Sequence, residues 1–129
     1  MIILTIRTDR QKSEIGLYDG ETQLIYEVWQ AHRRLAETIH LKIRGLLQSQ
    51  SKELSDIQGI IVYKGPGSFT GLRIGISVAN ALAYTLNVPI IGVEGVWVEE
   101  GIKPILAGKN DKTVLPEYGA AAHITPPKK

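Results

Sequence analysis

The spacing of apolar residues changes along the chain, and each change predicts a different kind of element. Residues 2–6 form a short apolar run, and apolar residues then alternate with polar ones over residues 13–18 and 22–29. Between these two alternating stretches lies Asp19-Gly20, which is a strong signal for a two-residue hairpin turn. The opening of the chain therefore predicts three antiparallel strands.

From His32 the apolar spacing becomes that of a helix. Leu35, Ile39 and Ile43 recur every fourth residue, and this pattern continues to about Gln48. A buried-type strand at residues 59–63, a second long helix and an apolar strand at residues 88–93 follow. The predicted order is β-β-β-α-β-α-β, which indicates an α/β protein with a mixed five-stranded sheet and helices packed on it.

Small residues recur every fourth position through the start of the second predicted helix. They are Gly67, Gly71, Gly75, Ala79 and Ala83, and positions four apart lie above one another on a helix. A glycine inside a helix costs roughly 1 kcal/mol relative to alanine. This small-residue stripe therefore indicates that another backbone approaches closely, either the protein's own sheet or the helix of a partner.

After Val93 the pattern weakens. Residues 94–100 fit a short helix or a strand, and Gly95 with two valines argues against a stable helix. A turn is expected at residues 108–112, a last strand at residues 113–115 and an extended tail at the end. We accordingly expect a folded lobe over residues 1–97 and a linker with a tail over residues 98–129.

Composition and motifs argue against several kinds of chemistry. There are no cysteines, and His32 and His40 lie about two helical turns apart, too far to share a metal ion. The Gly65-Pro66-Gly67 turn lacks the lysine of a phosphate-binding loop, so a turn with a capping Ser68 is the favoured interpretation over phosphate binding. We therefore predict no catalytic, cofactor-binding or metal-binding residues.

Charge and hydropathy indicate which partners and which cellular compartment to expect. The formal net charge of +2 is too small to indicate nucleic-acid binding. No apolar run approaches the roughly 20 residues of a membrane span, and the first apolar run is too short for a signal peptide. These features predict a cytoplasmic protein without a membrane partner.

One long run carries a family resemblance. Residues 64–75, Lys-Gly-Pro-Gly-Ser-Phe-Thr-Gly-Leu-Arg-Ile-Gly, an alanine-rich helix and Val-Pro-Ile-Ile-Gly-Val at residues 88–93 resemble the signature of the TsaB family, also called YeaZ. The resemblance covers roughly residues 1–97, and residues 115–118 and 123–127 resemble the family's C-terminal tail. It implies a single actin-like (ASKHA, ribonuclease H-like) lobe and a part in the synthesis of threonylcarbamoyladenosine in tRNA.

The resemblance also implies a mode of action. TsaB proteins are not the catalyst but pair with the catalytic paralogue TsaD, largely through the helices that match residues 32–48 and 68–86. A TsaE-like ATPase joins the complex, and tRNA is contacted only indirectly. The implied partner interface consists of His32, Leu35, Ala36, Ile39, Ile43, Gly67, Ser68, Phe69, Gly71, Leu72, Gly75, Ala79 and Ala83.

Two departures from the family pattern matter. Family members open with an apolar strand followed by Asp-Thr-Ser, whereas this chain has Arg7-Thr8-Asp9. An arginine there removes a ligand of a metal-bound water and argues against nucleotide hydrolysis. Moreover, only a short stretch follows Val98, so we expect a one-lobe member of the family. The alternatives are an actin-like ATPase or peptidase-type enzyme, and a homodimer that uses the same interface.

Overall fold

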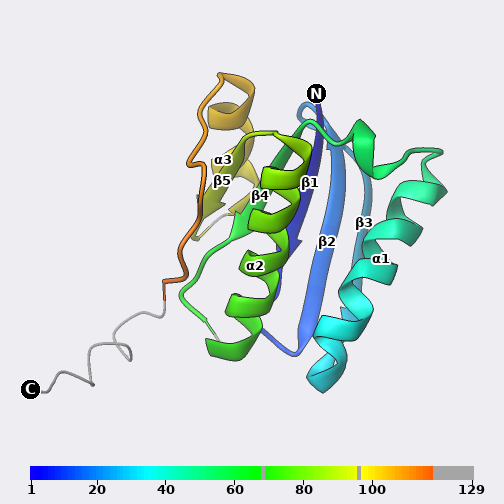
Figure 1. The fold of residues 1–129 in the computed structure, drawn as a ribbon, viewed down its shortest axis with the longest axis vertical. Helices are drawn as coiled ribbons and strands as arrows, with labels where there is room; N and C mark the ends of the chain where they lie inside the picture. The colour runs from blue at the N-terminus through cyan, green and yellow to red at the C-terminus, as the bar shows by residue number, and fades with distance from the viewer. Residues whose placement is uncertain (68, 96, 118–129) are drawn as a thin grey trace, which may run out of the picture.

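A five-stranded mixed sheet forms the centre of the molecule (Figure 1). The computed structural model describes residues 1–67, 69–95 and 97–117, without the side chains of His32 and Phe69. The strands are β1 (Ile2–Arg7), β2 (Lys12–Asp19), β3 (Thr22–Gln30), β4 (Gly59–Tyr63) and β5 (Ile90–Val93). They lie in the order β3-β2-β1-β4-β5, with antiparallel pairing on the β3 side of β1 and parallel pairing on the β5 side. The predicted fold class, element order and Asp19-Gly20 hairpin are confirmed.

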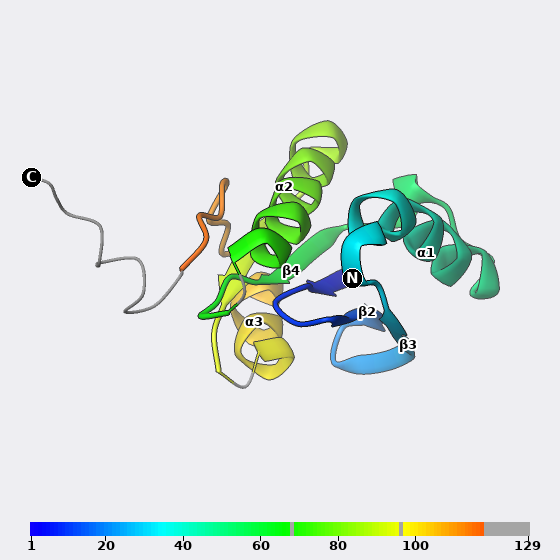
Figure 2. The ribbon, with the colours of Figure 1, turned by 90° about the horizontal axis from the view of Figure 1, so that it is seen from below.

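Helices cover both faces of this sheet (Figure 2). The helical elements are η1 (His32–Arg34), α1 (Leu35–Ser49), η2 (Leu54–Asp56), α2 (Phe69–Leu86) and α3 (Trp97–Leu106). Helices α1 and α2 lie on one face, and α3 lies on the other. Strand β4 is buried along its whole length because helices pack on both of its sides. Within the described part of the chain, none of the helices combines the length and apolar character that a bilayer span requires.

The small-residue stripe packs on the protein's own sheet. Ala79 and Ala83 are buried, and a side chain at Gly75 would collide with Thr8, which follows β1. The hydroxyl of Thr8 donates a hydrogen bond to the carbonyl oxygen of Gly71 at 2.7 Å. The stripe was compatible with close packing against the protein's own sheet or against a partner's helix. The structure shows that it packs against the sheet.

The stripe also begins later than expected. Helix α2 starts at Phe69, so Gly67 lies in the preceding turn, where an added side chain would collide with Asp9. Gly67 thus belongs to a packed turn and not to the helical stripe, because the chain reaches the sheet edge before the first helical turn forms.

The folded lobe extends beyond the predicted boundary at residue 97. Helix α3 is a regular element despite the weak sequence signal, because its buried residues recur at helical spacing and fill the space over β4 and β5. Gly101 sits directly against Ile61, where a larger residue would not fit. Of the short helix and the strand that the sequence left open for residues 94–100, the structure shows a helix that begins at Trp97. The argument from Gly95 and the two valines against a stable helix was wrong, since tertiary packing outweighs local propensity here.

Residues 109–117, here called the strap, run along the outer edge of β5. The backbone amide of Asp111 donates to the carbonyl oxygen of Ile90 at 2.8 Å, and the amide of Gly92 donates to the Asp111 carboxylate at 2.9 Å. Two further hydrogen bonds join the side chain of Asn80 on α2 to the backbone of Val114, both at 2.9 Å. The predicted strand at residues 113–115 is wrong, because the strap is held by single backbone and side-chain hydrogen bonds and forms no continuous ladder with β5. The predicted tail beyond it lies outside the described residues.

Substitution of helical glycines by alanine should distinguish the effect of close packing on stability from the effect of helix propensity. We expect Gly75→Ala to lower the free energy of unfolding by about 1–3 kcal/mol, because the new methyl group must displace Thr8. Gly45→Ala on α1, where nothing lies within 4 Å of an added Cβ, should raise it by about 0.5–1 kcal/mol. Urea titrations of both variants measure the difference. Equal gains in stability would show that α2 does not approach β1 so closely.

Candidate functional site

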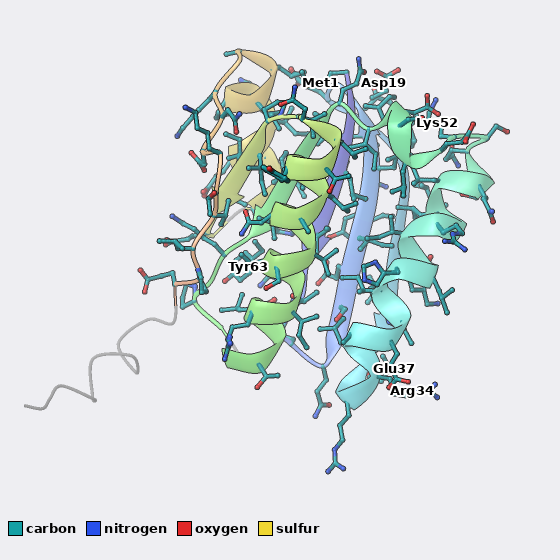
Figure 3. The ribbon with its side chains drawn as sticks, viewed as in Figure 1. Met1, Asp19, Arg34, Glu37, Lys52 and Tyr63 are labelled. Atoms are coloured by element: carbon teal, nitrogen blue, oxygen red, sulfur yellow. The ribbon has the colours of Figure 1, made fainter. Side chains whose placement is uncertain are left out.

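An ion pair closes the turn between β1 and β2. Arg7 Nε donates to Asp9 Oδ1 at 2.8 Å, and Nη2 donates to Oδ2 at 3.2 Å, so both carboxylate oxygens accept from one guanidinium. The Asp9 side chain is only 6% exposed. On its other side the guanidinium carbon lies 3.9 Å from the ring centroid of Tyr63, the last residue of β4. The labelled Tyr63 in Figure 3 marks the place of this cluster at the carboxyl end of β4.

The energetics of the cluster favour the ion pair. Burial opposes the charge of Arg7, but the hydrogen bonds and attraction of Asp9 outweigh it and raise the pKa of the guanidinium above its ordinary value. Burial, reinforced by Asp9, also raises the pKa of the Tyr63 hydroxyl, which donates to the carbonyl oxygen of Pro66 at 2.8 Å. The cluster therefore ties the turn after β4 to the turn after β1.

This arrangement does not fit the nucleotide and metal that actin-like proteins bind. Both oxygens of Asp9 are engaged by Arg7, and Gly67 packs against the Asp9 side chain. Among the residues that the structure describes, no group of three or more His, Asp or Glu side chains could hold a metal ion. The turn is built as an internally neutralised contact, in which the Arg7 guanidinium binds the Asp9 carboxylate.

A second polar network continues from this turn across the sheet. Arg10 donates to Glu14 at 2.7 Å, and the hydroxyl of Tyr26 donates to the same carboxylate at 2.6 Å. Burial and then the hydrogen bond to Glu14 raise the pKa of Tyr26 far above its ordinary value of 10.0. The network fixes β3 against the β1–β2 turn.

A groove lies between α1 and α2, on the face of the sheet that these two helices cover. It consists of two neighbouring hollows of about 340 and 440 Å³, which share the lining residues Thr70 and Ile74. The first hollow is lined by Ala36, His40, Thr70, Arg73, Ile74, Ser77 and Val78. The second is lined by Arg10, Gln11, Ser13, Ala31, Arg33, Leu35, Thr70, Gly71 and Ile74. In Figure 1 the two helices stand side by side over the sheet, with their first turns at the same end. We call this surface the α1–α2 groove.

Large apolar side chains are exposed on both helices and on the strap. Leu41 on α1 is 65% exposed and Tyr84 on α2 is 89% exposed. Leu115 of the strap is 74% exposed and lines a smaller hollow together with Arg73 and Ser77 of α2. Leu115 therefore adds an apolar side chain to the surface beside Arg73 and Ser77.

The structure separates the predicted interface residues into two groups. Ala36, Gly71 and Leu35 line the groove. The following residues of the prediction are buried against the sheet: Ile39, Ile43, Leu72, Gly75, Ala79 and Ala83. They cannot meet a partner in this fold, because the apolar stripe of a surface helix faces its own core. Gly67 packs on Asp9, and Ser68 and the side chains of His32 and Phe69 lie outside the described residues.

The sequence prediction missed the outer wall of the groove. His40, Arg73 and Ser77 lie on the faces of α1 and α2 that point away from the sheet. One signal was available: Ile74 and Val78 are apolar, four residues apart and offset from the small-residue stripe. A second apolar row beside the buried stripe of a helix indicates an additional contact surface.

The sheet order, with two helices on one face and one on the other, defines an actin-like, ribonuclease H-like lobe. Residues 29–97, more than half of the chain, match the family model "TsaD: tRNA N6-adenosine threonylcarbamoyltransferase". The tRNA threonylcarbamoyladenosine biosynthesis protein TsaB of Escherichia coli is 33% identical over 115 residues, which cover 83% of this chain and 49% of that protein. The TsaB of Bacillus subtilis is 32% identical over 93 residues, which cover 72% and 41%. The chain belongs to the TsaB (YeaZ) family.

Further comparisons agree with this assignment. The tRNA N6-adenosine threonylcarbamoyltransferase of Geotalea uraniireducens is 42% identical over 81 residues, covering 63% of this chain and 23% of that protein. The solved structure of YeaZ from Pseudomonas aeruginosa superposes with a TM-score of 0.67 at 28% identity, covering 72% of this chain and 43% of that one. A Thermus thermophilus RuvC bound to a Holliday junction has a TM-score of 0.51 at 14% identity, with coverage of 95% and 87%, and shows the fold alone. The chain spans about half the length of the curated TsaB relatives that it matches.

The ion pair at the β1–β2 turn should be strongly coupled. We expect Arg7→Met to cost about 2 kcal/mol or more of unfolding free energy, because it leaves the buried Asp9 carboxylate with only the exposed Arg10, at 3.9 Å, as an ion-pair partner. Asp9→Asn should also destabilise, and the double variant should lose about 1–3 kcal/mol less than the sum of the single losses. Urea denaturation of the four proteins completes this cycle. Additive losses would contradict the coupling.

The Tyr26 hydroxyl should make the protein sensitive to alkali. Its raised pKa means that the unfolded chain loses this proton first, so stability is intact below about pH 10 and falls as the pH rises above it. We expect Tyr26→Phe to flatten the fall in unfolding free energy between about pH 9 and 11. Tyr84→Phe, at an exposed tyrosine, should leave the slope unchanged. Equal slopes in all three proteins would refute this role of Tyr26.

Proposed function

We propose that this chain is a non-catalytic subunit in the synthesis of N6-threonylcarbamoyladenosine in tRNA. It binds a TsaD-like threonylcarbamoyltransferase through the α1–α2 groove. The names of its TsaB relatives support the pathway, and the match to the TsaD family model supports a partner of related fold. The protein works in the cytoplasm, a TsaE-like ATPase joins the complex, and tRNA is contacted through the partner.

The observation that carries this proposal is the groove itself. Ala36, Ile74 and Val78 give it apolar walls, while Thr70 and Ser77 leave room because their side chains are small. Paired helices that leave such a groove offer a site into which the ridge of a partner's helix can pack. The buried stripe holds α2 against the sheet, so the groove is presented on a fixed support.

The β1–β2 turn supports a role without catalysis. In this chain Arg7 occupies the position of the carboxylate that the family pattern places after the first strand, and it neutralises Asp9. A turn neutralised in this way supplies neither a general base nor a metal ligand. Binding, not chemistry, is the function that the described surface favours.

The test is co-expression with the TsaD-like protein of the same organism, followed by mass measurement of the purified complex. Ser77→Tyr, which fills the groove, should weaken the complex by about tenfold or more in calorimetry. The matched control Ser55→Tyr changes an exposed serine in η2, away from the groove, and should bind like the wild type. Wild-type affinity in Ser77→Tyr would exclude the groove as the interface, and absence of any complex with the wild type would refute the proposed function.

A further inference from the structure

The strap lies in a site whose shape matches it. Val114, which is only 4% exposed, packs over Gly92 of β5. The backbone of Glu117 packs over Gly65, which follows β4. A side chain at either glycine would collide with the strap, so the two glycines leave room for one strap side chain and for one stretch of strap backbone. We call this surface, formed by β5, the end of β4 and the adjoining side of α2, the strap site.

The strap site binds mainly to the backbone of the strap. The side-chain amide of Asn80 both accepts from the backbone amide of Val114 and donates to its carbonyl oxygen, each at 2.9 Å. At the end of the strap the amide of Glu117 donates to the carbonyl oxygen of Lys64 at 2.7 Å. Hydrogen bonds to the main chain are the means by which a protein holds an extended peptide, and a pocket such as that over Gly92 selects the side chain.

A short hinge, Ala107 and Gly108, joins α3 to the strap. Gly108 has a φ of +95°, and its amide donates to the carbonyl oxygen of Ile105 at 3.1 Å, which closes the last turn of α3. Among the described residues outside the hinge itself, no atom lies within 4 Å of the position of a Cβ at Gly108. The return of the strap to its own chain therefore depends on the backbone conformation of this glycine.

We propose that the strap site also accepts the strap of a second copy of this chain, so that two copies exchange straps reciprocally and form a dimer. Because the two sequences are identical, each contact described above forms again between the copies. Both strap sites are filled at once, so the assembly closes with twofold symmetry. The hinge is the part of each chain whose conformation has to change.

The tether between α3 and the strap explains why a second copy is the favoured occupant. A free peptide must compete with a strap that is held beside its site at a high effective concentration. In an exchange, each displaced strap finds an identical site on the other copy, so no binding energy is lost. The balance between monomer and dimer is then set by the hinge and by the protein concentration.

The exchange is independent of the proposed function. The strap, drawn in orange in Figure 1, lies on the side of α2 away from α1, and Figure 2 shows the same arrangement from below. A strap from a second copy takes the same place, so the lining of the α1–α2 groove stays the same. A dimer made by exchange therefore differs from one in which two α1–α2 surfaces meet.

Disulfide trapping tests the exchange directly, because the chain has no cysteine of its own. A Cβ at Gly92 would lie 2.6 Å from Cγ1 of Val114, which brings the two Cβ atoms within the range that a disulfide bond joins. Full-length Gly92→Cys and Val114→Cys are mixed, oxidised gently and analysed by non-reducing electrophoresis and mass spectrometry. We expect a covalent heterodimer. The double variant Gly92→Cys/Val114→Cys, at high dilution, should form the same bond within one chain.

The control mixture pairs Val114→Cys with Gly45→Cys, which places an exposed cysteine on α1. It should give at least about tenfold less heterodimer than the first mixture. Equal yields would show that the cysteines meet by random collision and would overturn the inference. So would a mixture without heterodimer when the double variant forms its internal bond.

Hinge variants test the exchange without any cysteine. Alanine disfavours a φ of +95°, so Gly108→Ala strains the closed monomer, and exchange relieves this strain in two hinges at once. We expect the association constant of the dimer, measured by analytical ultracentrifugation, to rise by about tenfold or more. Two glycines inserted after Gly108 should lower it, because a longer hinge lets the strap return to its own chain.

Gly20→Ala is the matched control for the hinge variants. Gly20 also has a positive φ, of +60°, and an added Cβ there has no described neighbour within 4 Å, but it lies in the turn between β2 and β3. It should leave the association constant unchanged, and circular dichroism checks that all variants are folded. A dimer that responds equally to Gly20→Ala and Gly108→Ala, or to neither, would belong to another surface, and the inference would be wrong whatever the trapping shows.

Discussion

The contact between Gly75 and Thr8 positions the second helix of the lobe, and much of the remaining architecture follows from it. Because Gly75 has no side chain, the side chain of Thr8 packs directly against the backbone of α2, and its hydroxyl reaches the carbonyl oxygen of Gly71. The rest of the small-residue stripe then faces the sheet. The row that contains Ile74 and Val78 is turned toward α1, and this row provides one wall of the groove.

Strand and hairpin positions were predictable because local patterns determine them. Alternation marks β2 and β3, and Asp19-Gly20 fixes their register at the turn. Helix α3 was not predictable in this way, since Gly95 and Pro104 weaken its local signal. Its glycine at position 101 is favourable only because Ile61 lies directly beneath it, and that proximity is a property of the folded sheet.

The candidate site was likewise predictable only in part. The sequence identifies Arg7 and Asp9 as unusual residues after the first strand, but their bidentate pairing and the stacking on Tyr63 depend on how β1 and β4 align. The stripe likewise indicates close packing without indicating the element that packs there. Periodicity shows which residues share a face, and only the assembled layers show whether that face is covered.

The strap along β5 has a consequence for the order in which the lobe matures during synthesis. Asn110 and Asp111 use their side chains to satisfy backbone amides of Ile90 and Gly92 that a neighbouring strand would otherwise bind. Until these residues leave the ribosome, the nascent sheet has an open edge that can pair with another chain. Asp111 follows Gly92 by only 19 residues in the sequence, which limits how long that edge is available to a chaperone or to a neighbouring nascent chain.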